Sequence, residues 1–378
     1  MHEIHDYIFE HQKEILKDIK YIVKADSPSR EKELMDSCAQ RIQQLFIRYF
    51  GYPAEVVKET LYGNHLRFEY GEGDRQILLL THFDTVWDAG ELTVKEDGNR
   101  IYGPGILDMK SGLVQAIWAI KSFHDLGINL NKRIVMLCTS DEEIGSPSSK
   151  KLIEQEALNS DAAFVMEPPV TSSGALKTGR KGTSKYTIEV NGRASHAGNH
   201  HKKGISAIRE IAKQILYVES LTDYDKGTTV NVGAIKGGGK LNVVPDKATI
   251  GIDIRAKTVE EQKRIHQLIM GLKPQTEGIV LNVKGGINRP PMERGKATFK
   301  LFKLAQEAAA GLGVHLVEAA VGGASDGNLT AHLGIPTLDG LGAMGSGIHE
   351  RSEHIVVDEI PNRTAILSML LLKTSSVQ

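Results

Sequence analysis

Between Tyr7 and Tyr49, apolar residues recur at the three-to-four-residue spacing of an amphipathic helix. The polar segment Asp26-Ser27-Pro28-Ser29 interrupts the pattern. Pro28 also disfavours helical backbone at the residue before it. The pattern therefore predicts two helical stretches, one on each side of this segment.

Three short runs are apolar at nearly every position, over residues 76–80, 133–137 and 162–166. Apolar residues without alternation indicate strands buried on both faces, as in a parallel sheet covered by helices. Helical patterns lie between the runs, over residues 113–123 and from Ser146-Pro147 to Leu158, where Ser-Pro resembles a helix cap followed by Pro in the first turn. Strands that alternate with helices predict an α/β fold.

From about residue 180 the pattern changes to strands that alternate polar and apolar residues, as expected when one face is wet. The order of expected elements is β-α-β-β-α-β, the ferredoxin-like arrangement. These elements cover residues 185–190, 205–218, 229–232, 248–254, 259–272 and 279–283. We therefore expect an inserted α+β domain at 180–291 within a discontinuous α/β domain at 1–179 and 292–378. The second part of the α/β domain contains a helix at 298–312, a strand at 335–338 and a helix at 359–373.

Composition narrows the function classes. The 378 residues include 46 Lys or Arg and 47 Asp or Glu, which gives a net charge of −1. This balance provides no excess of positive charge that would favour binding to nucleic acid. No apolar run approaches the ~18 residues of a membrane span, and the N-terminus lacks the pattern of a secretory signal. Cys38 and Cys138 are too few for a disulfide framework, and both are expected to be small buried hydrophobes. We expect a cytoplasmic protein that binds neither nucleic acid nor membrane.

Acids and histidines follow each of the three apolar strands. His82-Phe83-Asp84 follows the first, Asp141-Glu142-Glu143 the second and Glu167 the third. The carboxyl ends of parallel strands meet at one edge of a sheet, where ligands bind, so these side chains should converge. Crowded carboxylates repel one another unless a cation neutralises them, and a mixture of His and carboxylates suits zinc. The pattern predicts a metal site.

Three further features refine this hypothesis. Asp84 is better placed to orient the second ring nitrogen of His82 than to bind metal itself. Asp108 follows the Gly103-Pro104-Gly105 turn and precedes a helix, so it is either a helix-capping acid or part of the site. In Asp141-Glu142-Glu143, adjacent side chains cannot all reach one point. One of these acids can bind metal while its neighbour acts as general base on a water.

The motifs, taken in order, resemble those of the di-zinc metallopeptidase family that includes glutamate carboxypeptidase, succinyl-diaminopimelate desuccinylase, acetylornithine deacetylase and peptidase T. The resemblance extends from about residue 20 to 370 and agrees with an inserted lid and dimerisation domain. The motifs that carry it are His82-Phe83-Asp84-Thr85-Val86, Gly103-Pro104-Gly105, Asp108-Met109-Lys110-Ser111-Gly112, Asp141-Glu142-Glu143-Ile144-Gly145-Ser146, Glu167-Pro168 and His349-Glu350.

The resemblance implies a role for each motif residue. Asp108 matches the carboxylate that bridges two zinc ions, and the Asp108-Met109 peptide is expected to be cis. His82 and Glu167 match the other ligands of one zinc, while Glu143 and His349 match those of the second. Glu142 matches the general base and Asp84 the residue that orients His82. Asp108 stands where related amidohydrolases carry Cys, which favours the peptidase branch.

The resemblance also extends to the inserted domain. His196, in Ala194-Ser195-His196-Ala197-Gly198, matches a histidine that reaches the active site of the partner subunit and stabilises the oxyanion. Substrate-binding candidates lie both in this domain and in a Gly-Gly-x-Ser-Asp segment after it. They are Asn242, Arg255, Arg289, Gly323 and Ser325.

The resemblance implies a homodimeric hydrolase with two Zn2+ per subunit, for which Co2+ or Mn2+ are possible substitutes. The expected reaction is cleavage of an amide bond beside a free carboxylate by a hydroxide that bridges the metals. The glutamate-carboxypeptidase-like branch, which releases a C-terminal amino acid from a small peptide, is the nearest match. A deacylase of N-acyl or N-succinyl amino acids remains the alternative, because the motifs describe the metal centre and not the substrate pocket. A non-catalytic protein on the same scaffold would be expected to have lost some of these residues.

Overall fold

The computed structural model describes residues 2–377, and the chain divides into two compact units. Unit 1 comprises Met1–Gly179, Arg294–Val321 and Ser325–Gln378. Unit 2 comprises Arg180–Glu293 and Gly322–Ala324. The insertion of one unit within the other means that segments distant in sequence meet in unit 1.

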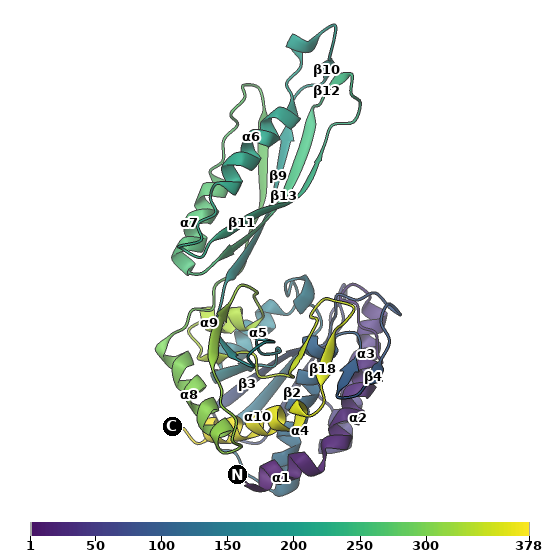
Figure 1. Ribbon diagram of the computed structural model, residues 1–378, viewed down its shortest axis with the longest axis vertical. Coiled ribbons are helices and arrows are strands. Elements are labelled where there is room, and N and C mark those ends of the chain that lie inside the picture. The colour runs from purple at the N-terminus through teal and green to yellow at the C-terminus, as the bar shows by residue number, and fades with distance from the viewer. Residues whose placement is uncertain (1, 378) are drawn as a thin grey trace. The chain divides into compact units, whose positions relative to one another are not determined.

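Unit 1 is built on a six-stranded sheet in the order β1-β2-β6-β3-β7-β16 (Figure 1). β6, β3, β7 and β16 are parallel, whereas β1 and β2 run antiparallel at one edge. The strands are β1 (Glu55–Val57), β2 (His65–Tyr70), β3 (Gln76–His82), β6 (Arg133–Thr139), β7 (Ser160–Val165) and β16 (Thr337–Leu338). This arrangement confirms the predicted α/β fold with a mostly parallel sheet.

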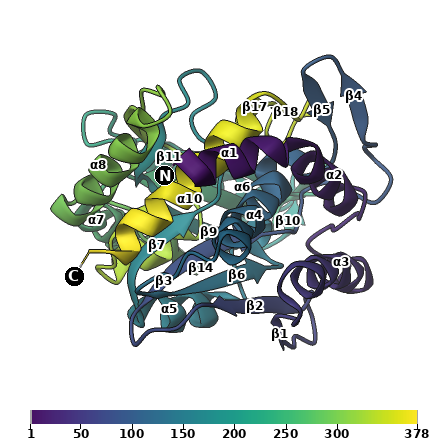
Figure 2. The ribbon, with the colours of Figure 1, turned by 90° about the horizontal axis from the view of Figure 1, so that it is seen from below.

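Alternate residues of β3 enter different hydrophobic clusters. Ile77 and Leu79 pack into the larger cluster with α4 and α10, while Leu78 and Leu80 pack on the opposite face with α5 and α9. Figure 2 shows α4 and α10 on one side of this sheet and α5 on the other. Because both faces are covered, the strand is apolar at successive positions, as its sequence predicts.

Helices and short antiparallel sheets complete unit 1. The helices are α1 (His2–Glu10), α2 (Gln12–Val23), α3 (Lys32–Phe50), α4 (Ser111–Leu126), α5 (Lys150–Leu158), α8 (Lys296–Ala310), α9 (Gly327–His332) and α10 (Glu359–Ser375), with single turns η1 (Ile106–Lys110) and η2 (Glu142–Ile144). One small sheet has the order β17-β18-β5-β4, and β15 pairs with β8. These strands are β4 (Lys95–Asp97), β5 (Arg100–Tyr102), β8 (Leu176–Arg180), β15 (Glu318–Val321), β17 (Gly345–Ser346) and β18 (His354–Val356).

The predicted start of α5 is wrong. Ser146 has a φ of 58°, which is left-handed backbone, and the helix begins at Lys150. The buried Asp141 carboxylate accepts the backbone N–H groups of Ser148 at 2.7 Å and Ser149 at 3.1 Å. A distant acid therefore satisfies these N–H groups just before the helix, in place of the local Ser146-Pro147 cap.

Unit 2 has the predicted β-α-β-β-α-β order, and its four-stranded antiparallel sheet has the order β11-β13-β9-β14. Tyr186, Ile188 and Val190 of β9 point into a core shared with α6 and α7, so alternate residues face away, as the pattern predicts. The elements are β9 (Gly182–Asn191), β10 (Ser195–His196), η3 (His201–Lys203), α6 (Ala207–Glu219), β11 (Thr229–Gly237), β12 (Val243–Val244), β13 (Lys247–Ala256), α7 (Val259–Met270) and β14 (Val280–Arg289).

Two further observations concern the cysteines and the apolar character of the helices. Cys38 and Cys138 are buried free thiols, which confirms their prediction as small core residues. Across residues 2–377, no helix has both the length and the apolar character needed to cross a bilayer.

Candidate metal centre

The carboxyl ends of three parallel strands bring the predicted residues of unit 1 together. His82 ends β3, and its Nε2 atom lies 3.1 Å from Oδ1 of Asp108 and 3.5 Å from Oε1 of Glu167, which follows β7. All three residues are buried. The strand pairing, rather than sequence proximity, creates this cluster.

Asp108 lies on the turn η1, which leads from β5 into α4. Gly105 opens this turn with a φ of 66°, and a Cβ atom there would lie 2.4 Å from Cγ2 of Thr85. The Asp108-Met109 peptide is cis, as the family resemblance implied. Oδ1 of Asp108 faces His82, while Oδ2 lies 3.5 Å from Nε2 of His349. The two oxygens of one carboxylate therefore face two different histidines.

His349 comes from the loop that joins β17 to β18. Its backbone φ is 60°, and its half-exposed ring places Nε2 3.2 Å from Oε1 of Glu143. Asp108, Glu143 and His349 thus form a second group beside the one around His82. The two groups share Asp108.

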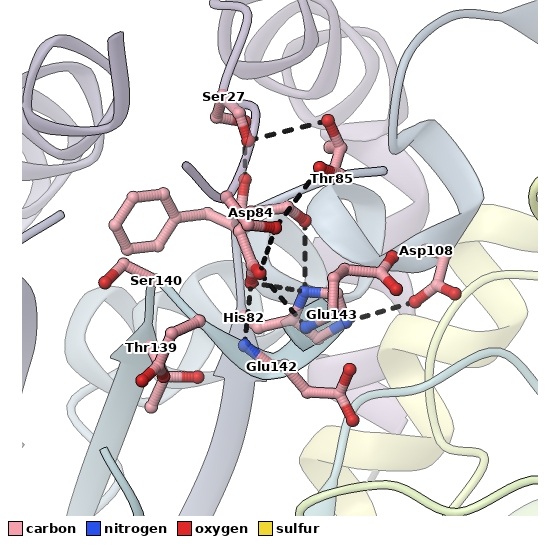
Figure 3. A network of polar contacts seen from close by, with 12 residues as sticks. Ser27, His82, Asp84, Thr85, Asp108, Thr139, Ser140, Glu142 and Glu143 are labelled. Atoms are coloured by element: carbon pink, nitrogen blue, oxygen red, sulfur yellow. Dashed lines mark hydrogen bonds and ion pairs between the residues drawn. The ribbon is translucent and has the colours of Figure 1, made fainter. Parts of the chain in front are cut away.

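Asp84 connects the strand ends beneath these groups. Its fully buried carboxylate accepts the backbone N–H of Glu142 at 3.1 Å on Oδ1 and that of Glu143 at 3.0 Å on Oδ2. Nδ1 of His82 lies 3.2 Å from both Oδ1 and the carbonyl oxygen of Asp84. Ser29 donates its hydroxyl to Oδ2 at 2.8 Å. Figure 3 shows Asp84 between His82 and the backbone of Glu142.

The three consecutive acids after β6 have separate surroundings. Asp141 is fully buried and accepts hydrogen bonds from Ser148 and Ser149, so it stabilises the segment before α5. Glu142 and Glu143 instead direct carboxylate oxygens toward the His82 cluster. The structure thereby separates the structural acid from the two acids at the site.

The charges of the site are strongly coupled. Burial opposes ionisation of Asp108, but hydrogen bonds from His349 and His82 outweigh burial and hold the pKa of Asp108 well below its usual range. Hydrogen bonds to Asp108 and Glu143 raise the pKa of His349 to about 10. Burial raises the pKa of Glu143 to about 7, and the charge of Asp108 adds to this effect. The pKa of His82 also lies well above its usual value, because hydrogen bonds to carboxylates, first of all Asp108, outweigh burial.

The donor set fits divalent metal ions. One oxygen or nitrogen from each of His82, Asp108 and Glu143 lies within 4.8 Å of the others, and the same holds for His82, Glu142 and Glu167. Buried carboxylates beside imidazoles are typical ligands of catalytic zinc. A bound metal ion would take the place of the protons that the histidines hold and would compensate the carboxylate charges. The residues present are therefore chemically suited to hold the metal ions that the motifs imply.

In unit 2 the structure brings His196 and Asn242 together. His196 lies on β10, which pairs with β12, and the N–H of Ala197 donates to the carbonyl oxygen of Asn242 at 2.9 Å. Nδ1 of His196 lies within 3.1 Å of the backbone N–H groups of Gly198 and Asn199. Because Nδ1 accepts these bonds, the neutral ring carries its proton on Nε2. His196 is thus prepared to donate a hydrogen bond.

Two other candidates lie elsewhere in unit 2. Arg255 occupies the far end of β13 from the β10–β12 ribbon and binds Asp253, with Nε 2.7 Å from Oδ1. Arg289 is buried at the end of β14, next to Thr183 of β9. The structure does not bring either arginine to His196 and Asn242.

The Gly-Gly-x-Ser-Asp segment makes structural contacts. The carbonyl oxygen of Gly323 accepts a hydrogen bond from Arg180 at 3.1 Å within unit 2. In unit 1, Ser325 is fully buried, donates to Oδ2 of Asp339 at 2.6 Å and accepts the N–H of Gly327 at 3.1 Å. The hydroxyl of Ser325 therefore organises the start of α9.

Sequence reasoning missed Glu353. Trp87 is buried, but its Nε1 also donates to Oε2 of Glu353 at 2.8 Å. The other hydrogen bonds that the Glu353 carboxylate accepts come from the turn that carries Asp108. The only sequence signal was an acid four residues after His349, a spacing with no chemical meaning until β18 is placed beside β5.

Comparison with known proteins agrees with this geometry. Residues 78–373 match the sequence model of the family described as "Peptidase family M20/M25/M40". Carboxypeptidase G2 of Pseudomonas sp. (strain RS-16) is 30% identical over 80% of this chain and 74% of its own length. A succinyl-diaminopimelate desuccinylase of Sulfurimonas denitrificans is 26% identical over 80% of this chain and 85% of its own.

A solved structure shares the fold as well. An M20 family metallo-carboxypeptidase from Sulfolobus solfataricus superposes with a TM-score of 0.75 at 20% identity, covering 95% of this chain and 99% of the other. The family match spans most of the chain and includes every residue of the candidate metal centre. The chain therefore belongs to peptidase family M20/M25/M40 and is a hydrolytic enzyme.

Proposed function

We propose that this enzyme is a di-zinc carboxypeptidase that releases a C-terminal amino acid from a small peptide. The observation that carries the proposal is the Asp108 carboxylate, whose Oδ1 faces His82 and whose Oδ2 faces His349. This geometry suits a bridging ligand. His82 and Glu167 would complete one metal site, and Glu143 and His349 the other. Co2+ or Mn2+ would fit the same donors.

When bound, the two metal ions supply Lewis-acid polarisation of the substrate carbonyl and acidify a water. Glu142 is the proposed general base, which takes the proton of the attacking water and returns it to the leaving amine. The backbone N–H of Glu142 donates a hydrogen bond to Asp84, which fixes the backbone that carries the Glu142 side chain. Asp84 also positions the ring of His82, so one buried acid aligns a metal ligand and the base.

We further propose that unit 2 forms a lid and a homodimer contact, with His196 acting in the site of the partner subunit. The Nε2–H of His196 would donate to the oxyanion that develops on the carbonyl oxygen. The adjacent Asn242 is the proposed substrate contact on the same ribbon. Arg255, Arg289, Gly323 and Ser325 remain proposed substrate-binding residues, and the cytoplasmic location remains a prediction.

The carboxypeptidase assignment draws on the similarity to carboxypeptidase G2, which is the more similar of the two relatives described above. The second candidate is a deacylase of N-succinyl or N-acyl amino acids, favoured by the similarity to a desuccinylase over the same share of the chain. Both reactions hydrolyse an amide next to a carboxylate. The metal centre serves either reaction equally.

A product assay tests the proposal. The zinc-loaded enzyme is incubated with dipeptides, peptides ending in Glu or Asp, and N-acetyl or N-succinyl amino acids, and products are identified by mass spectrometry. Free C-terminal amino acids from the peptides support the proposal. Acetate or succinate alone assigns the deacylase reaction, and no product from any substrate contradicts both.

The role of Glu142 is tested in the same assay. Glu142→Gln should lower kcat by about 100- to 10,000-fold, the usual contribution of general acid–base catalysis, with metal content unchanged. The matched control is Glu72→Gln, the same substitution in the exposed loop between β2 and β3, which should leave kcat unchanged. A Glu142→Gln enzyme that keeps its activity, or that loses its metal, contradicts the assigned role.

A further inference from the structure

Glu353 is a buried acid that belongs to none of the candidate metal groups among the described residues. Oε1 accepts the backbone N–H groups of Leu107 at 2.9 Å and Asp108 at 3.1 Å. Oε2 accepts the N–H of Gly105 at 3.1 Å and the indole N–H of Trp87 at 2.8 Å. Each oxygen thus has two donors, so this carboxylate is committed to holding the turn rather than to binding metal.

The fold explains how Glu353 reaches this turn. β18 begins at His354, which pairs with Tyr102 of β5, and β5 leads directly into the turn that carries Asp108. The strand pairing therefore delivers the preceding Glu353 to the backbone N–H groups at the start of η1. Such N–H groups at the start of a helical turn have no partner within the turn itself. A carboxylate satisfies several of them with charge-assisted hydrogen bonds.

The same loop also carries His349. The N–H of Glu353 donates to the carbonyl oxygen of Glu350 at 2.9 Å, and the N–H of Glu350 donates to that of Gly347 at 2.8 Å. His349 lies inside this hydrogen-bonded loop and faces Oδ2 of Asp108. Glu353 consequently ties the loop that presents His349 to the turn that presents Asp108.

We propose that Glu353 is a positioning residue that sets the distance between Asp108 and His349, and with it the affinity of the metal site formed by Asp108, Glu143 and His349. This inference rests on the proposed two-metal centre. The site around His82 and Glu167 shares Asp108, but its other two ligands stand at strand ends that Glu353 does not contact, so it should be less sensitive. A purely structural role would instead lower stability without favouring one metal site over the other.

Glu353→Gln is the informative variant. One amide oxygen can still accept two N–H groups, but the NH2 group then faces the other two donors, whichever way the amide is oriented. The matched control is Trp87→Phe, which removes the indole donor while leaving Glu353 and its three backbone bonds. Both variants should unfold at a lower urea concentration than the wild type.

Zinc affinity is measured by competition with a chromophoric chelator, which resolves the two sites. For Glu353→Gln we expect the site that His349→Ala removes to lose about 10- to 100-fold in affinity, as for other residues that orient metal ligands. The other site should change by less than about 3-fold. Trp87→Phe should leave both affinities near the wild-type values. In a His349→Ala background, which removes the second site, adding Glu353→Gln should change the remaining affinity by less than about 3-fold.

The possible failures are distinguishable. Wild-type protein that binds fewer than two zinc ions overturns the proposed metal centre and this inference with it. Wild-type protein that binds two, with equal affinity losses at both sites in Glu353→Gln, overturns the inference alone. Unchanged affinities in Glu353→Gln, or a loss in Trp87→Phe as large as in Glu353→Gln, have the same consequence and leave the proposed function standing.

Discussion

Replacing Asp84 by Asn tests whether one buried carboxylate aligns the whole centre. The substitution keeps the shape of the side chain but changes one acceptor oxygen into an NH2 donor. Oδ1 and Oδ2 each accept a backbone N–H, from Glu142 and Glu143. The amide can satisfy only one of these, whichever way it is oriented. The hydroxyl of Ser29 can rotate to accept from the new NH2 group, but a backbone N–H cannot.

The structure sets a lower limit on the effect. At least one buried N–H loses its acceptor, which costs about 1–3 kcal/mol, and the bonds that remain lose the assistance of the carboxylate charge. We therefore expect the free energy of unfolding of the metal-free protein to fall by at least about 1–3 kcal/mol. Zinc affinity should fall by about 10- to 100-fold, because the ring of His82 loses its anionic partner.

Urea denaturation of the metal-free protein and zinc competition with a chelator provide the two measurements. The matched control is Ser29→Ala, which removes one donor to Asp84 and leaves both backbone bonds. This control should cost about 1 kcal/mol in stability and leave zinc affinity nearly unchanged. Wild-type stability and zinc affinity in Asp84→Asn would refute the assignment of Asp84 as the aligning residue.

The other predictions concern protons, packing, unit 2 and metal removal. In the metal-free protein the pKa values of about 10 for His349 and about 7 for Glu143 mean that His349 is protonated at pH 7 and Glu143 is about half protonated. Zinc binding should therefore release protons and strengthen as pH rises toward 10. Calorimetry in buffers of different ionisation enthalpy measures this release, and its absence contradicts the assigned ligands. Gly112→Ala should destabilise unit 1 by about 1–3 kcal/mol in urea denaturation, because its Cβ would lie 2.1 Å from the carbonyl oxygen of Met166; wild-type stability contradicts this close approach. His196→Ala should lower kcat without changing zinc content, and unchanged kcat excludes an oxyanion contact. Removing the metal with a chelator should lower the unfolding free energy, by about 4 kcal/mol if the free metal had been at about 1,000 times Kd; an unchanged unfolding curve contradicts a bound metal.

Much of the fold was predictable because local patterns report how many faces of an element are buried. The uniformly apolar run at 76–80 predicted a strand covered on both sides, and Ile77 and Leu78 do pack into different clusters. Alternation in β9 predicted one wet face, as the buried positions of that strand confirm. The start of α5 was not predictable, because Asp141 satisfies the N–H groups before the helix from outside the local segment.

The sequence by itself determined which residues stand at the strand ends, because the end of each apolar run locates its acids and histidines to within a residue or two. Only the tertiary structure decided which of these side chains face the candidate metal centre and which bind other parts of the protein. Asp141 turns away from its two acidic neighbours, and Arg255 is paired with Asp253. Glu353 reaches the turn of Asp108 across 245 positions of the chain. Local periodicity carries no information about contacts of this range, because the pairing of β18 with β5 creates them when the chain folds.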